Sequence, residues 1–298
     1  MNSPTNIRAI LAMVVSMGVF VTSDSCMKLA LADAPLFQLM VMRGIASITI
    51  CFTLILAMGQ AGHISRMFNK WLVGRGLLEV VANLGFTVGL AYVAIADLTA
   101  IAQTAPLFVL LGAWAFRGMK LDWQRMALIL LGIVGALRVA QPGQGTASTF
   151  ALIAFATPVA SAIRDLMTPN VPRDMPPLVA TFTVLVILAG AGLIGMLAFE
   201  TPVMPTGRHV MLMALAGATG VAGHLLLYIT YRIGDTRTVA PFMYTLTIWA
   251  VLSGLILFGD VPNTLAIGGM ALVAMAGLAI IWLEGRQRRV EAAVALGT

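Results

Sequence analysis

Apolar runs long enough to cross a membrane fill almost the whole chain of 298 residues. A helix needs about 20 apolar residues to span a hydrocarbon core roughly 30 Å thick. Only 10% of the residues are charged, whereas a soluble chain carries about 25%. The longest hydrophilic stretch follows Leu283 and is too short for a separate domain. The sequence therefore predicts an all-α integral membrane protein, with the lipid bilayer as its main partner.

Ten transmembrane helices are predicted, separated by the Pro, Gly, Asp and basic residues that usually punctuate helices. Polar residues separate the first apolar run from the cleavable-looking Ala30–Ala32, so we expect no signal-peptide cleavage. The predicted spans are Ile7 to Leu31, Pro35 to Met58, Trp71 to Ile95, Leu98 to Phe116, Trp123 to Val139, Phe150 to Met167, Pro177 to Phe199, His209 to Tyr231, Thr238 to Phe258 and Thr264 to Leu283.

The basic residues predict the orientation, because cytoplasmic loops retain Lys and Arg. With the N-terminus inside, fourteen of the 18 basic residues fall on the cytoplasmic side, and Lys28, Arg43, Arg138 and Arg208 lie toward the other. Both termini are therefore predicted to be cytoplasmic. The net charge of +6 is spread over short loops rather than one folded face, so we expect no nucleic-acid partner.

The chain repeats itself. Ala96–Ala102 before the fourth span resembles Gly234–Ala240 before the ninth, and Phe116–Met119 corresponds to Leu257–Asp260. We therefore predict two five-helix repeats, 1–145 and 146–298, the second ending in a short basic cytoplasmic tail. Because five is odd, the second copy enters from the opposite side, giving two inverted repeats around a central cavity. This arrangement is typical of transporters.

The motifs resemble the EamA family of the drug/metabolite transporter superfamily. The matching stretches are Ile95–Ile101, Thr104–Phe108, Tyr231–Asp235, Val239–Tyr244 and Leu257–Pro262. The resemblance implies a bacterial inner-membrane carrier; many members export amino acids and related metabolites, including the YddG-type exporters of aromatic amino acids. It also implies a cavity lined mainly by helices one, three, four, six, eight and nine. Gly118-Met119 departs from the Gly-Glu that the family often has, so no role of that acid can be carried over.

Proline-bearing helices at corresponding places of two repeats are typical of transport sites, since unwound backbone offers polar groups at the midplane. Pro106 in the fourth span and Pro241 in the ninth form such a pair. The cluster Thr22 to Ser25 and the dipeptide Thr157-Pro158 form a looser one. The alternative is a tolerated kink, which membrane helices commonly contain.

Glu79 lies about two turns inside the third span, with Asn83 one turn later on the same face. A carboxylate at that depth costs on the order of 2.5 to 3.5 kcal/mol, so it should face a cavity or a partner. It could bind a substrate amino group or a proton, or form a structural ion pair with Arg75. His224, with Tyr228 one turn later, could hydrogen-bond substrate or couple protons, or be a satisfied core residue.

Other polar and aromatic residues near the midplane are candidates for the cavity wall, where rings could stack on a flat apolar solute. They are Gln103 and Thr104 in the fourth span, Ser161 in the sixth, and Tyr244 and Trp249 in the ninth. Asp24, Lys28 and Arg43 lie toward the outer side, where they could neutralise one another or line a vestibule.

Several classes of function are disfavoured because the sequence lacks their motifs. The sequence has no HExxH, no metal-spaced Cys or His set and no GxxxxGK[ST] loop, so we predict no metal, no cofactor and no ATP hydrolysis. We predict a secondary transporter that exports amino acids or related small metabolites by alternating access, driven by a gradient. A membrane-embedded enzyme and a channel or lipid flippase are the alternatives. The sequence is compatible with a monomer and does not fix the oligomeric state.

Overall fold

The computed structural model describes residues 4–118, 122–141, 146–167, 170–172, 174–233 and 239–295. Within these ranges the chain forms helices and turns, and contains no strand. Ten helical segments of this part are long and apolar enough to cross a membrane, which confirms the predicted all-α membrane fold. Seven of them are continuous helices: α1 (Pro4–Ala30), α2 (Leu36–Ala57), α3 (Lys70–Leu90), α6 (Trp123–Ala140), α9 (Pro177–Phe199), α10 (Gly207–Ile233) and α13 (Thr264–Ala295).

The other three spans are broken, each near a proline. The fourth comprises α4 (Ile95–Ala102) and α5 (Ala105–Arg117), with Pro106 in the first turn of α5, and the sixth comprises α7 (Thr146–Ile153) and α8 (Ala156–Met167). The ninth comprises η3 (Ala240–Tyr244), α12 (Thr245–Ser253) and the π-helical turn η4 (Gly254–Phe258). Proline has no N–H to continue the helical hydrogen bonds, which explains the breaks. In contrast, α1 runs unbroken through the cluster Thr22 to Ser25.

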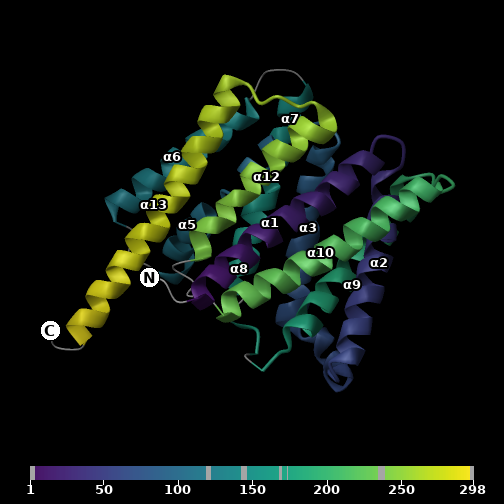
Figure 1. Cartoon of the computed structure of the whole chain (residues 1–298), viewed down its shortest axis with the longest axis horizontal. Coiled ribbons are helices and arrows are strands. Elements are labelled where there is room, and N and C mark those ends of the chain that lie inside the picture. Colours follow the sequence, from purple (N-terminus) through teal and green to yellow (C-terminus); the bar gives the residue numbers. More distant parts are fainter. Residues whose placement is uncertain are drawn as a thin grey trace.

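The helices pack in pairs that join the two halves of the chain. The most extensive contacts run between α1 and α10, α6 and α13, α2 and α9, and α3 and α8. Figure 1 shows α1 between α12 and α10, with α6 and α13 together at one side of the bundle. α1 begins and α13 ends at the same end of the bundle, as an even number of spans requires (Figure 1). A short 3₁₀ helix, η1 (Ala61–Phe68), connects α2 to α3.

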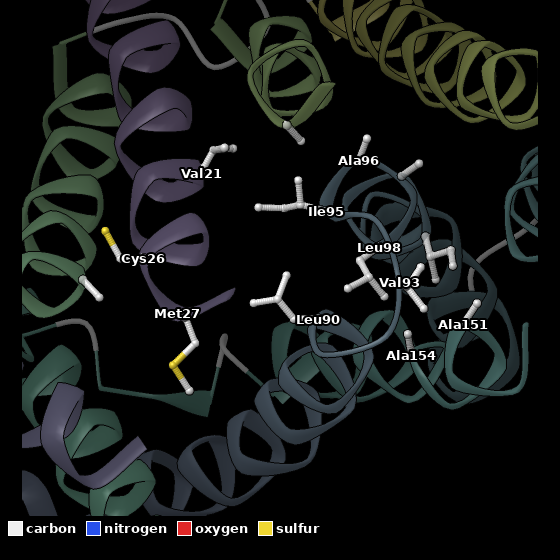
Figure 2. Packing of buried hydrophobic residues seen from close by; sticks show 14 of the residues in the cluster. Val21, Cys26, Met27, Leu90, Val93, Ile95, Ala96, Leu98, Ala151 and Ala154 are labelled. Carbon is white, nitrogen blue, oxygen red and sulfur yellow. The ribbon is translucent and has the colours of Figure 1, made fainter. Parts of the chain in front are cut away.

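The end of the bundle where α1 finishes and α2 begins is filled with apolar side chains; we call it the closed end. Its main cluster joins the end of α1, the turn between α3 and α4, and the end of α7. Figure 2 shows Val21 of α1 and Ile95 of α4 pointing toward each other, with Leu90 of α3 beside them. Each of these three side chains is buried. These packed side chains close this end of the bundle.

Ionic contacts tie the same end together. Lys28 Nζ lies 3.1 Å from Asp260 Oδ2 and 3.0 Å from the Val93 carbonyl oxygen, so it links α1 to the segment after η4 and to the α3–α4 turn. On the other side of the bundle, Asp33 accepts hydrogen bonds from Arg208 at 3.1 Å and His209 at 2.9 Å. Lys28 therefore pairs with Asp260, and not with Asp24 as one sequence-based interpretation allowed.

Replacing Asp33 with Asn tests one of these ties. The hydrogen bond from His209, helped by the charges of His209 and Arg208, holds the pKa of Asp33 below its usual value. A lowered pKa in the folded state stabilises the fold above the ordinary carboxyl pKa of about 4, and this contribution disappears as pH falls through the lowered value. We expect wild type to melt above Asp33→Asn at pH 7 in detergent. The difference should vanish in acid; a difference constant with pH would contradict this.

Glycines allow α6 and α13 to approach with their backbones in contact. A Cβ atom at Gly269 would lie 2.5 Å from the carbonyl oxygen of Gly135, and one at Gly135 would lie 2.9 Å from that of Gly269. The neighbouring Gly268 has nothing within 4 Å of such an atom. Small residues of this kind let membrane helices pack closely.

The pair Gly268 and Gly269 offers a matched test of this packing. Gly269→Ala should lower the free energy of unfolding by about 1–3 kcal/mol, because the methyl group would press on backbone that cannot rotate away. Gly268→Ala should be neutral or stabilising by up to about 1 kcal/mol, since alanine favours helix. Thermal unfolding of the two variants in detergent decides this, and equal melting temperatures would count against the close approach.

Candidate functional site

A cavity of about 460 Å³, lined by both polar and apolar side chains, reaches the middle of the bundle from the end opposite the closed end. Its mouth is formed by the α8–α9 connection at Val171, Pro172 and Met175, and its walls by α2, α3, α8, α9 and α10. It lies between the two halves of the chain. A cavity of roughly 300–1,000 Å³ suits a small organic molecule.

Glu79 of α3 and Arg164 of α8 form an ion pair in the wall of this cavity. Glu79 Oε2 accepts a hydrogen bond from Arg164 Nη1, and Arg164 Nε also donates to Asp165 at 2.9 Å. The Glu79 and Arg164 side chains are about a quarter exposed, so the pair lies in the wall rather than in the packed interior. The predicted partner Arg75 is not part of this ion pair, although it also lines the cavity. Helix α8 supplies the counter-ion from 85 residues along the chain.

Arg43, Ser47 and Asn83 form the inner end of the cavity. They line both the main cavity and a narrow extension of about 40 Å³ beside it. Asn83 Oδ1 accepts a weak hydrogen bond from Thr87 at 3.4 Å, which leaves its amide NH₂ free to face the cavity. Asn83 thus lines the cavity from α3, and Arg43 and Ser47 line it from α2.

His224 faces the same cavity from α10. Its Nδ1 lies 2.8 Å from the Gly220 carbonyl oxygen, and because a carbonyl can only accept, Nδ1 carries the proton. The ring packs edge-on against Phe20 at 4.9 Å between centroids. In the neutral ring Nε2 is then an acceptor that solvent or a solute can reach.

The predicted residues of the fourth span do not line this cavity. Gln103 donates to the Met243 carbonyl oxygen at 3.4 Å and accepts from Thr247 at 2.7 Å, tying the break after α4 to η3 and α12. Thr104 is fully buried and donates to the Ile101 carbonyl oxygen. Pro106 starts α5. These residues join the fourth span to the ninth.

The predicted residues of the sixth and ninth spans do not line this cavity either. Trp249 donates through Nε1 to the Val14 carbonyl oxygen at 3.0 Å, and Tyr244, the last residue of η3, is buried against Gly277 of α13. Pro241 is part of η3, and Ser161 is half-buried on α8 outside the cavity lining. Tyr228 belongs to α10, but its side chain lies outside the described residues.

The lining therefore differs from the one that the family resemblance implies. The third, sixth and eighth spans contribute as expected, but the second and seventh, α2 and α9, take the places expected for the first, fourth and ninth. The reason is packing: α12 contacts both α1 and α4, and it shares polar groups with α1 and with the end of α4. Ser25 on α1 and Ser253 on α12, for example, hydrogen-bond at 2.6 Å.

Comparison with known proteins places this architecture in a family. The model of the EamA-like transporter family matches residues 7–140. A riboflavin transporter of Rhizobium johnstonii is 30% identical over 215 residues, covering 70% of each chain. The chain belongs to the EamA-like transporter family. This EamA transporter is also 24% identical to a pseudopaline exporter of Pseudomonas aeruginosa over 91% of its own length and 95% of the exporter.

Further relatives widen the range of solutes within the family. An S-adenosylmethionine uptake transporter of Rickettsia felis is 21% identical, covering 70% of this chain and 71% of the relative. A solved crystal structure superposes with a TM-score of 0.65 at 18% identity, covering 95% of this chain and 99% of the other, a likeness of fold alone. The EamA protein is thus a multi-pass membrane transporter for small molecules, and not an enzyme.

Proposed function

We propose that this EamA protein is a secondary carrier that exports amino acids or related small metabolites by alternating access. The observation that carries the proposal is the one-sided cavity: polar groups line an opening from one end to mid-bundle, while ion pairs and an apolar layer fill the other end. A carrier that works by alternating access needs this state and a second one in which the cavity opens at the other end. Glu79, Asn83 and His224 are our proposed solute contacts.

The helix contacts support the proposed inverted repeats, 1–145 and 146–298. Exchanging each span with the one five places along turns the α1–α10 contact into the α8–α3 contact. The same exchange turns the α2–α10 contact into the α9–α3 contact, and the α5–α8 contact into the α12–α1 contact. Two copies of one unit related by a two-fold axis would produce this pattern.

Side-chain hydrogen bonds support the same relation. Ser23 on the first span donates to the Ala216 carbonyl oxygen on the eighth at 2.8 Å, and Thr157 on the sixth donates to that of Ala82 on the third at 2.8 Å. The fourth and ninth spans each end at a left-handed glycine, Gly118 at φ 64° and Gly259 at φ 67°.

The distribution of basic residues supports placing both termini in the cytoplasm of a bacterial cell, with the protein in the inner membrane. The mouth of the cavity would then face the cytoplasm and the closed end the periplasm. A cavity that opens inward collects solute from the cell, as an exporter requires. With no nucleotide-binding loop in the sequence, the free energy would come from a gradient of the solute or of protons.

Counterflow of labelled amino acids in proteoliposomes tests this proposal. Vesicles loaded with an unlabelled amino acid should accumulate the labelled form, with a rate that saturates, because exchange requires a carrier that returns loaded. Vesicles that contain unrelated membrane protein provide the control. Flux that rises linearly with concentration would indicate a channel and overturn the alternating-access proposal.

A further inference from the structure

We propose that the cavity selects solutes with a net negative charge, and that Arg43 binds their carboxylate at its inner end. This inference rests on the proposed carrier function and narrows its substrates to organic acids, acidic amino acids among them. Three observations support it: the sign of the charges in the cavity wall, the lack of ion pairs at two of the arginines there, and the positions of these arginines along the cavity.

The first step concerns the sign of the charge. Three guanidinium groups line the cavity, those of Arg43, Arg75 and Arg164, against the single carboxylate of Glu79. That carboxylate already accepts a hydrogen bond from Arg164, which is held by Asp165 as well. Because Arg164 is bonded to it, Glu79 offers little net negative charge to a solute ammonium group. The cavity is therefore poorly suited to a cation.

The second step concerns the two other arginines. Among the ion pairs of the described residues, none involves Arg43 or Arg75. Asp24 lies close enough to Arg43 to feel its charge, but the two form no ion pair and Asp24 is not part of the cavity wall. The Nε of Arg75 is buried with no acceptor among the described residues. Cations inside a membrane are costly unless they are paired, so these two favour an anion in the cavity.

The third step concerns position. Asn83 and Arg75 lie eight residues apart on α3, which corresponds to about 12 Å along the helix axis. Arg75 is thus nearer the mouth, where it attracts an incoming anion, and Arg43 is at the inner end with Ser47 and Asn83. Arginine holds a carboxylate by two parallel hydrogen bonds, and the Asn83 amide can add a further donor. Val184, Leu185 and Leu188 of α9 offer apolar surface to the hydrocarbon part.

A series of solutes of equal chain length and different charge tests the inference. Labelled glutarate, glutamate, glutamine and ornithine are compared in proteoliposomes, by initial rates over a range of concentrations. We expect glutarate to be carried at least tenfold more efficiently than glutamine, with glutamate between them and ornithine last. Glutamine or ornithine carried as well as glutarate would overturn the anion inference and leave the carrier intact. No saturable flux of any of the four would count against both proposals.

Arginine variants test which residue is responsible for the selection of anions. Arg43→Gln should raise the half-saturating concentration of glutarate roughly tenfold, which is the usual loss for a charge-assisted hydrogen bond. Arg43→Lys should keep part of the affinity, and Arg75→Gln should mainly slow uptake at low ionic strength. Arg138→Gln, an exposed arginine on α6 outside the cavity wall, is the matched control and should behave as wild type. Equal effects of Arg43→Gln on glutarate and glutamine would show a structural role instead.

Discussion

A Lys28→Cys/Asp260→Cys variant joined by a short thiol cross-linker is expected to lose nearly all solute flux. In the structure these two side chains meet at 3.1 Å and link α1 to the segment after η4 at the closed end. If the cavity opens alternately to either side, this contact must separate once in every cycle. A covalent link would hold the carrier in one state, which binds solute but cannot release it on the other side.

The chain offers a matched control for this cross-link. Gln141 and Asn263 also meet at the closed end, through hydrogen bonds of 2.8 and 3.2 Å. They join the end of α6 to the start of α13, and not the segments that Lys28 and Asp260 connect. Because the backbones of α6 and α13 are already in contact, a cross-link there should leave flux near the parental rate. Both experiments need Cys26 and Cys51, which are buried free thiols, replaced with Ala. Flux should return when a cleavable linker is cut; full flux with the 28–260 link intact would contradict the proposed opening.

Reversing the charge at position 79, with the variant Glu79→Arg, is expected to have the second largest effect on stability and flux. It places two guanidinium groups together in the cavity wall, where Arg164 now pairs with Glu79. Breaking a buried pair costs about 3–5 kcal/mol, and the partial exposure of this one reduces the loss to about 2 kcal/mol. We expect a lower melting temperature in detergent and flux reduced at least tenfold.

The reverse change on the partner shows whether the loss is electrostatic. Adding Arg164→Glu to Glu79→Arg restores opposite charges and should recover part of both stability and flux. Recovery should be incomplete, because Glu at position 164 would adjoin Asp165, which now bonds Arg164 at 2.9 Å. Glu79→Gln, which removes charge without adding any, should lie between wild type and the single reversal. A double variant no better than Glu79→Arg would contradict the pairing.

The sequence predicted the membrane fold well because span length and hydropathy are local properties. The ten spans, the proline-associated breaks at Pro106 and Pro241, and the isolated midspan polar groups Glu79, Asn83 and His224 can each be read within a single helix. The structure brings those three polar residues to one cavity. Their role in transport stays a prediction.

The arginines of the cavity were not recognised, since their role depends on contacts between distant helices. Arg164 was counted with the cytoplasmic loops, yet it lies in the last turn of α8 and reaches Glu79. Spacing along one helix favoured Arg75 as the partner, because residues four apart share a face. Arg43, counted toward the outer side, was a visible signal: an arginine within an apolar span needs a reason to be there.

The proline breaks illustrate the opposite error. Unwound backbone at Pro106 and Pro241 predicted polar groups open to solute, but here the breaks satisfy each other. Gln103 bridges them by bonding both Thr247 and the Met243 carbonyl oxygen. Sequence shows that a helix is interrupted but not which groups compensate for it.

The backbone contact between Gly135 and Gly269 has a consequence for how such a bundle can move. Bulky side chains can change rotamer and let helices slide, whereas two main chains in direct contact have nothing to rearrange. We therefore expect α6 and α13 to move as one rigid body through the whole transport cycle, while the remaining helices tilt relative to this pair. Spin labels across this pair should report a constant separation in every state of the carrier.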